Sequence, residues 1–238
     1  MTITESEIWD RFNKKSIPDC SEWLQTAYSL KLSQEVRDLI GERLGLLGNK
    51  GWTSIKILIK RNGPQPELIN AAGLSHHKEA RDLLLERLNT QDQLELRTVK
   101  ALACWGATIP IKQLKKILNH NSKEMRLAGL NLLGYKSHLL NDIQLLELVE
   151  DLIIDFRQEV VIETINLLQR RSEDTIINCI SKIARNRTDE VVEIAIIALG
   201  SIGTKQSSLN LQELTQELEI ESHKTMAKKQ LSHQYGND

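Results

Sequence analysis

Hydrophobic residues recur along this chain at steps of three and four positions, and the stretches that carry them are separated by short polar breaks. The segment 124–133 is typical, because Met125, Ala128 and Leu132 follow one another at these steps. Such spacing places apolar side chains on one face of an α-helix. In this segment little polar face remains, which is typical of a helix covered on most sides. The pattern therefore predicts short helices packed in layers.

A motif that returns about every thirty residues organises these helices. In the four clear copies a glutamate is followed ten residues later by a glycine or, once, by a glutamine. The clearest copies run from Glu35 to Gly45, from Glu124 to Gly134, from Glu159 to Gln169 and from Glu190 to Gly200, with looser copies at Glu67 and Glu95. The steps between glutamates are 32, 28, 29, 35 and 31 residues. A period in this range indicates stacked units, none of which can bury its apolar face alone.

Each repeat is predicted to contain two helices, the second of which begins at the glutamate. The first helices are expected over 52–60, 78–88, 111–118, 142–154 and 174–184. A glutamate in the first turn is favoured by the positive end of the helix dipole. The glycine is expected to end the helix in the left-handed conformation. Asn121-Ser122 and Thr188-Asp189 are candidate N-caps.

The fold class predicted from this pattern is an all-α solenoid of about five to six helix pairs. Residues 1–34 are expected to supply an N-terminal capping helix and the first outer helix. Repeats fill 35–205, and 206–238 form a C-terminal cap and tail. No linker rich in proline, glycine or serine interrupts the chain, so a single solenoid over 1–238 is predicted.

The repeat resembles a known family. Units of about thirty residues that open with Glu-Val-Arg or Glu-Val-Val and close with Leu-Gly resemble HEAT repeats, and the run Ala198-Leu199-Gly200-Ser201-Ile202-Gly203 resembles the helix end of the HEAT-like repeats named after phycobilisome lyases. The resemblance implies an α-solenoid. It also implies one of several activities, since that family includes bilin lyases, a bilin isomerase, a phycobilisome-degradation factor and adaptors.

Composition excludes several classes of protein. The net charge is -1 with a pI near 6.6, so nucleic acid is an unlikely partner. The first residues carry no basic segment and no apolar run reaches 18 residues, so neither a signal peptide nor a membrane span is expected. The 3 cysteines are far apart, which argues against a disulfide framework. These features favour a cytoplasmic protein.

Charge is nevertheless unevenly distributed. Segment 110–140 carries six basic residues and one acidic residue, whereas 141–160 carries six acidic residues and one basic residue. One interpretation is a basic patch that binds an acidic partner, formed by Lys112, Lys115, Lys116 and Lys123. The alternative is that these side chains are solvated and pair with their acidic neighbours.

The second helices are expected to line the concave face, where HEAT-like arrays usually bind. Aligning the repeats on their glutamates makes Asn131 and Asn166 equivalent, and Glu163 and Arg170 extend the Asn166 face. The candidate binding groove comprises Arg97, Lys100, Arg126, Asn131, Glu163, Asn166 and Arg170. For Arg97 and Arg126, which stand third in their copies, the alternative role is to tie one repeat to the next.

Candidate chemistry is sparse. Cys104 precedes Trp105, and a thiol there could hold a tetrapyrrole only if its pKa were lowered; packing as a small apolar residue is the preferred interpretation. His76-His77 lack further metal ligands at suitable spacing and are expected at a helix start or as a polar pair on the surface, so no metal site is predicted. No catalytic motif is found, and the sequence leaves open whether the protein is an enzyme.

Two functions follow. The first is a HEAT-repeat scaffold that holds a partner protein on its concave face and needs no cofactor. The alternative, which rests on the family resemblance alone, is a bilin lyase or bilin-handling chaperone in phycobiliprotein maturation or phycobilisome turnover. Its substrate would be a linear tetrapyrrole, and its partner a phycobiliprotein or a second HEAT subunit.

Overall fold

The computed structural model describes residues 3–14, 20–90, 94–187 and 190–235, and all of the regular structure in them is helical. The α-helices are α1 (Glu5–Asn13), α2 (Ser21–Ala27), α3 (Gln34–Leu46), α4 (Asn49–Asn62), α5 (Pro66–Leu74), α6 (Lys78–Thr90), α7 (Leu96–Leu102), α8 (Ile111–Leu118), α9 (Lys123–Lys136), α10 (Asp142–Ile153), α11 (Gln158–Leu168), α12 (Asp174–Arg185), α13 (Glu190–Ile202), α14 (Lys205–Glu217) and α15 (Glu221–Tyr235). Two short 3₁₀ helices, Ala103–Thr108 and Ser137–Leu139, follow α7 and α9. The predicted all-α class is confirmed.

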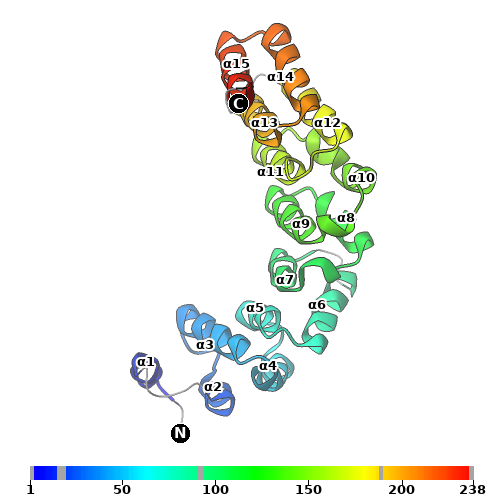
Figure 1. Cartoon of the computed structure of the whole chain (residues 1–238). Helices are drawn as coiled ribbons and strands as arrows, with labels where there is room; N and C mark the ends of the chain where they lie inside the picture. The colour runs from blue at the N-terminus through cyan, green and yellow to red at the C-terminus, as the bar shows by residue number, and fades with distance from the viewer. Residues whose placement is uncertain (1–2, 15–19, 91–93, 188–189, 236–238) are drawn as a thin grey trace. The chain divides into compact units, whose positions relative to one another are not determined.

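The predicted helix pairs are present. The five first helices appear as α4, α6, α8, α10 and α12, and the second helices as α3, α5, α7, α9, α11 and α13 (Figure 1). Ser122 caps α9 as predicted, because its hydroxyl accepts a hydrogen bond from the Met125 amide at 3.3 Å. The second cap candidate, Thr188-Asp189, lies outside the described residues.

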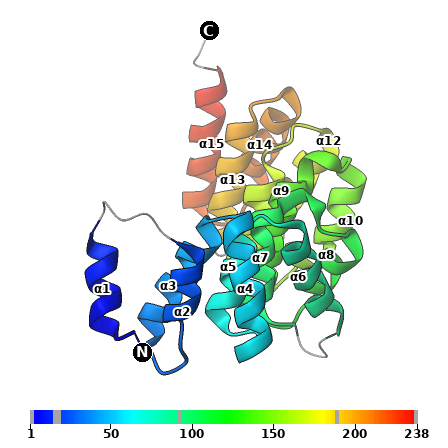
Figure 2. The same ribbon diagram turned by 90° about the horizontal axis from the view of Figure 1, so that it is seen from below.

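The chain divides into two compact units, 1–113 and 114–238, and the boundary falls within α8. In the first unit α3, α5 and α7 pack side by side, and α2 packs against α4 in the other layer (Figure 2). In the second unit α9, α11 and α13 form one layer, α10, α12 and α14 form the other, and α15 covers α13 and α14. Each unit is therefore a stack of helix pairs. The prediction of one continuous solenoid stays a prediction.

The glycines of the clear copies do not end their helices, so that prediction is wrong for them, whereas Gly106, which ends the looser copy at Glu95, follows α7 and has a φ of 44°. Gly45 and Gly200 lie inside α3 and α13, whereas the positive φ angles occur three residues later, at Gly48 (60°) and Gly203 (67°). A Cβ atom at Gly45 would lie 2.7 Å from the Leu74 Cβ and 3.0 Å from the Ala71 carbonyl oxygen. The glycine is needed for the close approach of α3 to α5 and not for a turn.

Ion pairs join residues one repeat apart. The Arg37 Nε lies 3.1 Å from the Glu67 Oε1, and the Arg126 Nη1 lies 2.7 Å from the Asp155 Oδ2. Both carboxylates are buried, with residue exposures of 1% for Glu67 and 5% for Asp155. The Tyr28 hydroxyl also donates a hydrogen bond to Glu67 at 2.6 Å. In two copies, at Arg37 and Arg126, the third motif position thus supplies an arginine that connects neighbouring repeats.

Asp155 has the denser set of hydrogen bonds. Its carboxylate accepts from the Arg126 guanidinium, from the Arg157 guanidinium at 2.8 Å and from the Arg157 amide at 2.9 Å. Burial by itself would raise the pKa of Asp155, but the hydrogen bonds from Arg157 and the charges of both arginines outweigh burial and hold that pKa below its usual value. The ionised form is therefore stabilised by folding.

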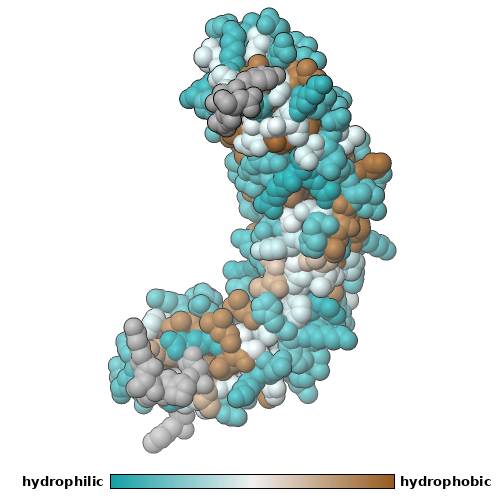
Figure 3. Space-filling model, in the orientation of Figure 1, coloured by the Kyte–Doolittle hydropathy of each residue, from teal (hydrophilic) through white to brown (hydrophobic). Residues whose placement is uncertain are grey.

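The outer surface is mixed. The face drawn in Figure 3 is mostly hydrophilic and is interrupted by separate hydrophobic patches. Large exposed apolar side chains include Leu46, Ile154 and Phe156, at 69%, 77% and 84% exposure. Among the described residues, no helix has both the length and the apolarity that a membrane crossing requires.

Substitution of Asp155 by alanine is expected to destabilise the second unit by about 3 to 5 kcal/mol, because two largely buried guanidinium groups lose their partner. The matched control is Glu159→Ala, which removes only the exposed ion pair with Lys123 and should leave the stability nearly unchanged. Urea unfolding should be followed by far-ultraviolet circular dichroism, since all 4 tryptophans lie in the first unit.

The pH dependence gives a second readout. Because the folded-state pKa of Asp155 is depressed, its contribution is complete above the unfolded-state pKa of about 3.9 and is lost as the pH falls toward the folded-state value. The stability difference between the wild type and Asp155→Ala should therefore shrink below about pH 4. Equal stability of the two proteins at neutral pH would show that the pair contributes nothing.

Candidate functional site

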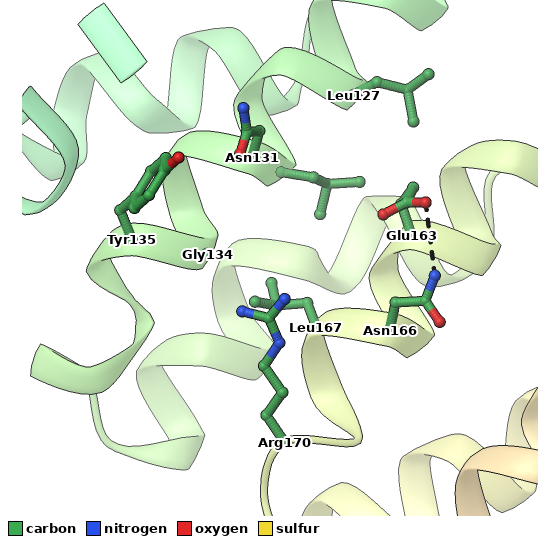
Figure 4. Close-up of a pocket in the computed structure, with 9 residues that line it drawn as sticks. Leu127, Asn131, Gly134, Tyr135, Glu163, Asn166, Leu167 and Arg170 are labelled. Carbon is green, nitrogen blue, oxygen red and sulfur yellow. Dashed lines mark hydrogen bonds between the residues drawn. The ribbon is translucent and has the colours of Figure 1, made fainter. Parts of the chain in front are cut away.

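A groove opens between α9 and α11 in the second unit, with a volume of about 490 Å³. Figure 4 shows the side chains that line it on the two helices, with Asn131 and Tyr135 on α9 and Glu163 and Asn166 on α11. Arg170 follows the end of α11 and points back into the groove. The groove thus combines an amide on each wall with one basic and one acidic group.

The groove forms here because the apolar ridges of α9 and α11 pack against each other below it. Leu130 and Leu167 are 5% and 4% exposed and form its floor. Leu127 and Tyr135 are more accessible, and Tyr135 is 51% exposed. A floor of leucine beside an exposed aromatic ring offers apolar contact to a ligand.

The two asparagines occupy equivalent positions on adjacent helices. Asn131 is exposed, and no hydrogen bond to its side chain is seen within the described ranges. The Asn166 amide donates to Glu163 at 3.5 Å and accepts from Gln169 at 3.4 Å, both long for hydrogen bonds. Donors and acceptors on both walls are therefore available to a ligand.

Adjacent arginines at the end of α11 have different roles. Arg171 donates to the Ser137 and Leu140 carbonyl oxygens at 2.5 and 2.8 Å and pairs with Asp142, so it joins this repeat to the previous one. Arg170 is exposed, and its guanidinium has no ion-pair partner in the part of the chain described. The guanidinium lies over Gly134 of α9, where an added Cβ would be 3.8 Å from Nη1.

Of the seven predicted groove residues, four line this groove: Asn131, Glu163, Asn166 and Arg170. Lys100 lines a separate groove of the first unit, together with Asp38, Glu42 and Cys104. Arg97 is exposed on α7 and lines neither groove. Arg126 holds Asp155, which is the alternative role considered for it.

The predicted basic patch is only partly free. Lys112, Lys115 and Lys116 are exposed on α8. Lys123, by contrast, pairs with Glu159 at 2.8 Å, and the hydrogen bond between them raises the pKa of Lys123 and lowers the pKa of Glu159. Part of the charge contrast in the sequence is therefore neutralised between repeats.

The histidine pair lies directly before α6, and His77 accepts a hydrogen bond from its first turn. The His77 Nδ1 accepts a hydrogen bond from the Glu79 amide at 3.2 Å, and its ring stacks on Trp52 with centroids 5.7 Å apart. His76 has a φ of 50° and lies beside Trp105, with ring centroids 5.8 Å apart. No group of three metal-ligating side chains occurs among the described residues.

Cys104 lies in the 3₁₀ helix after α7 and is half-buried. Burial raises the pKa of its thiol above the usual value. A nucleophilic cysteine needs the opposite shift, since the thiolate is the reactive form. The geometry therefore agrees with a packing role for Cys104.

Sequence reasoning did not include Tyr135 or the leucine floor in the groove. Tyr135 follows the motif glycine directly, and Leu127 and Leu130 look like any apolar helix residues. The departure of one copy from the pattern, Gln169-Arg170-Arg171 in place of glycine, was the available signal that the surface changes here.

No protein-family description and no curated protein matches this sequence. Among solved structures, human deoxyhypusine hydroxylase in complex with glycerol is similar at 14% identity and a TM-score of 0.41, covering 96% of this chain and 91% of that chain. A designed armadillo repeat protein is similar at 15% identity and a TM-score of 0.42, covering 90% and 99%.

Alkylation tests the state of Cys104. Because burial raises the pKa of its thiol, reaction with iodoacetamide at neutral pH should be much slower than for a small free thiol, and the rate should rise with a midpoint above about 8.5. Mass spectrometry of the modified peptide resolves Cys104 from Cys20 and Cys179. Rapid alkylation at neutral pH would contradict a packing role.

Proposed function

We propose that this chain is a helical-repeat scaffold that binds a segment of a partner protein in the groove between α9 and α11. The observation that carries the proposal is a set of polar groups that make at most long hydrogen bonds among the described residues and lie over an apolar floor, on one face of adjacent second helices. An apolar floor with a few polar groups above it is typical of a binding site.

The chemistry of the groove suits a polypeptide. An asparagine side chain offers one acceptor and two donor hydrogens, the same groups that a peptide backbone presents. Asn131 and Asn166 offer them on opposite walls, and the leucine floor with Tyr135 can take an apolar side chain. A protein segment supplies both kinds of contact along its length.

Bilin handling, as a lyase or as a chaperone, is the second candidate. Arg170 gives it a physical basis, since a free guanidinium binds a carboxylate such as a bilin propionate. The raised pKa of Cys104 is unfavourable for a covalent intermediate on this chain. In this alternative the chain would present the tetrapyrrole to an acceptor cysteine on another protein, with catalysis by proximity.

Groove substitutions test the proposal. Peptides that bind the wild type are first selected from a displayed random library. Their affinity should fall at least about tenfold when Asn131, Asn166 and Arg170 are all replaced by alanine, because this variant lacks both the amide hydrogen bonds and the cation of the groove. These side chains are at least partly exposed, so circular dichroism should be unchanged. Lys115→Glu with Lys116→Glu, at exposed positions on α8, is the control.

The alternatives give different results. Binding lost only in the α8 variant would assign the partner site to the basic patch. Failure of selection to yield any peptide that depends on the groove would contradict the proposed function. Colour in protein purified after co-expression with a bilin-producing pathway, abolished by Arg170→Ala, would favour bilin handling instead.

A further inference from the structure

We propose that the groove selects an extended segment carrying one acidic and one basic side chain about three residues apart. This inference rests on the proposed function and specifies the ligand of that site. It comes from the arrangement of charge within the groove, where a lone cation and a lone carboxylate lie apart on one wall (Figure 4).

Each charged group is available to a ligand. Arg170 is exposed without an ion-pair partner among the described residues, and its planar guanidinium matches a carboxylate through two parallel hydrogen bonds. Glu163 is exposed, and within the described ranges its carboxylate accepts only the long 3.5 Å hydrogen bond from Asn166. The two groups do not pair with each other, so the groove has one positive and one negative end.

The spacing of these ends fixes the spacing in the ligand. Glu163 lies in α11 and Arg170 lies two residues after its end, so the seven positions between them place their Cα atoms roughly 10 Å apart at the helical rise of about 1.5 Å per residue. An extended chain of the polyproline II type rises about 3.1 Å per residue with three residues per turn. Its side chains at positions i and i+3 therefore leave from the same side, about 9 Å apart, close to the separation of the two Cα atoms in the groove.

The groups between the ends agree with such a segment. Asn131 and Asn166 can pair with backbone amides and carbonyls, which an extended chain leaves unpaired. Leu130 and Leu167 lie below, where a side chain between the two charges can pack. The carboxylate of Glu163 repels a second anion, so a phosphate-rich ligand such as nucleic acid fits this groove poorly.

A panel of short capped peptides tests the inference by fluorescence anisotropy at low salt, where screening is weakest. Some peptides carry an acidic and a basic residue at positions i and i+3, in both orders, because the peptide could lie in the groove in either direction. The others carry two acidic residues, two basic residues, or one acidic residue next to one basic residue. The wild type should bind one mixed i,i+3 order about fivefold more tightly than the diacidic, dibasic or adjacent-charge versions.

Charge reversal provides matched variants. Arg170→Glu should shift the preference to the dibasic peptide, and Glu163→Lys should shift it to the diacidic peptide, each by about fivefold. Because both side chains are exposed, neither variant is expected to lose its fold, which circular dichroism checks. Exchange of preference between two variants of the same groove is a readout that a merely structural role would not give.

The failures are distinguishable. Equal binding of all the peptides by the wild type, with binding still lost in the Asn131, Asn166 and Arg170 triple variant, would overturn the charge selection and leave the proposed function standing. Absence of binding for every charged peptide, while library selection yields groove-dependent uncharged segments, would do the same. Absence of groove-dependent binders in both experiments would overturn both proposals.

Discussion

Carboxylates buried between repeats are the groups on which the rest of this structure depends. Glu67 and Asp155 each sit where an arginine of the preceding copy reaches them, 30 and 29 residues earlier in the chain. A buried carboxylate without such a partner would be costly, so the register between successive helix pairs is fixed by charge as well as by apolar packing. That register places the α9 and α11 walls of the groove opposite each other.

Glycines inside the second helices supply the complementary steric constraint. Gly45 permits α3 to approach the α5 backbone, and Gly73 does the same for α5 and α7, since an added Cβ would lie 2.5 Å from the Ala101 carbonyl oxygen. Gly134 differs, because its nearest neighbours are the side chains of Arg170 and Leu167 at 3.8 and 4.0 Å. The same motif position therefore allows a close helix contact at Gly45 and leaves room for the Arg170 side chain at Gly134.

The charged side chains around the groove fall into two groups, those held by a partner between repeats and those exposed in the groove. Arg126, Arg157 and Arg171 each have short contacts to a carboxylate or to backbone carbonyls. Arg170 and Glu163 are exposed and are not joined to each other. In a chain whose net charge is only -1, such local imbalance is what can give a groove polarity and select a ligand.

The sequence by itself determined the helices, their pairing and four residues of the groove, because helical periodicity and repeat alignment depend only on local spacing. Asn131 and Asn166 could be matched by counting positions. Only the tertiary structure distinguished Arg170 from Arg171, assigned Arg126 to Asp155 and moved the motif glycines inside their helices. These outcomes depend on which atoms of the neighbouring repeat lie within contact distance. Packing between helices sets those distances, and the order of residues within a single helix does not.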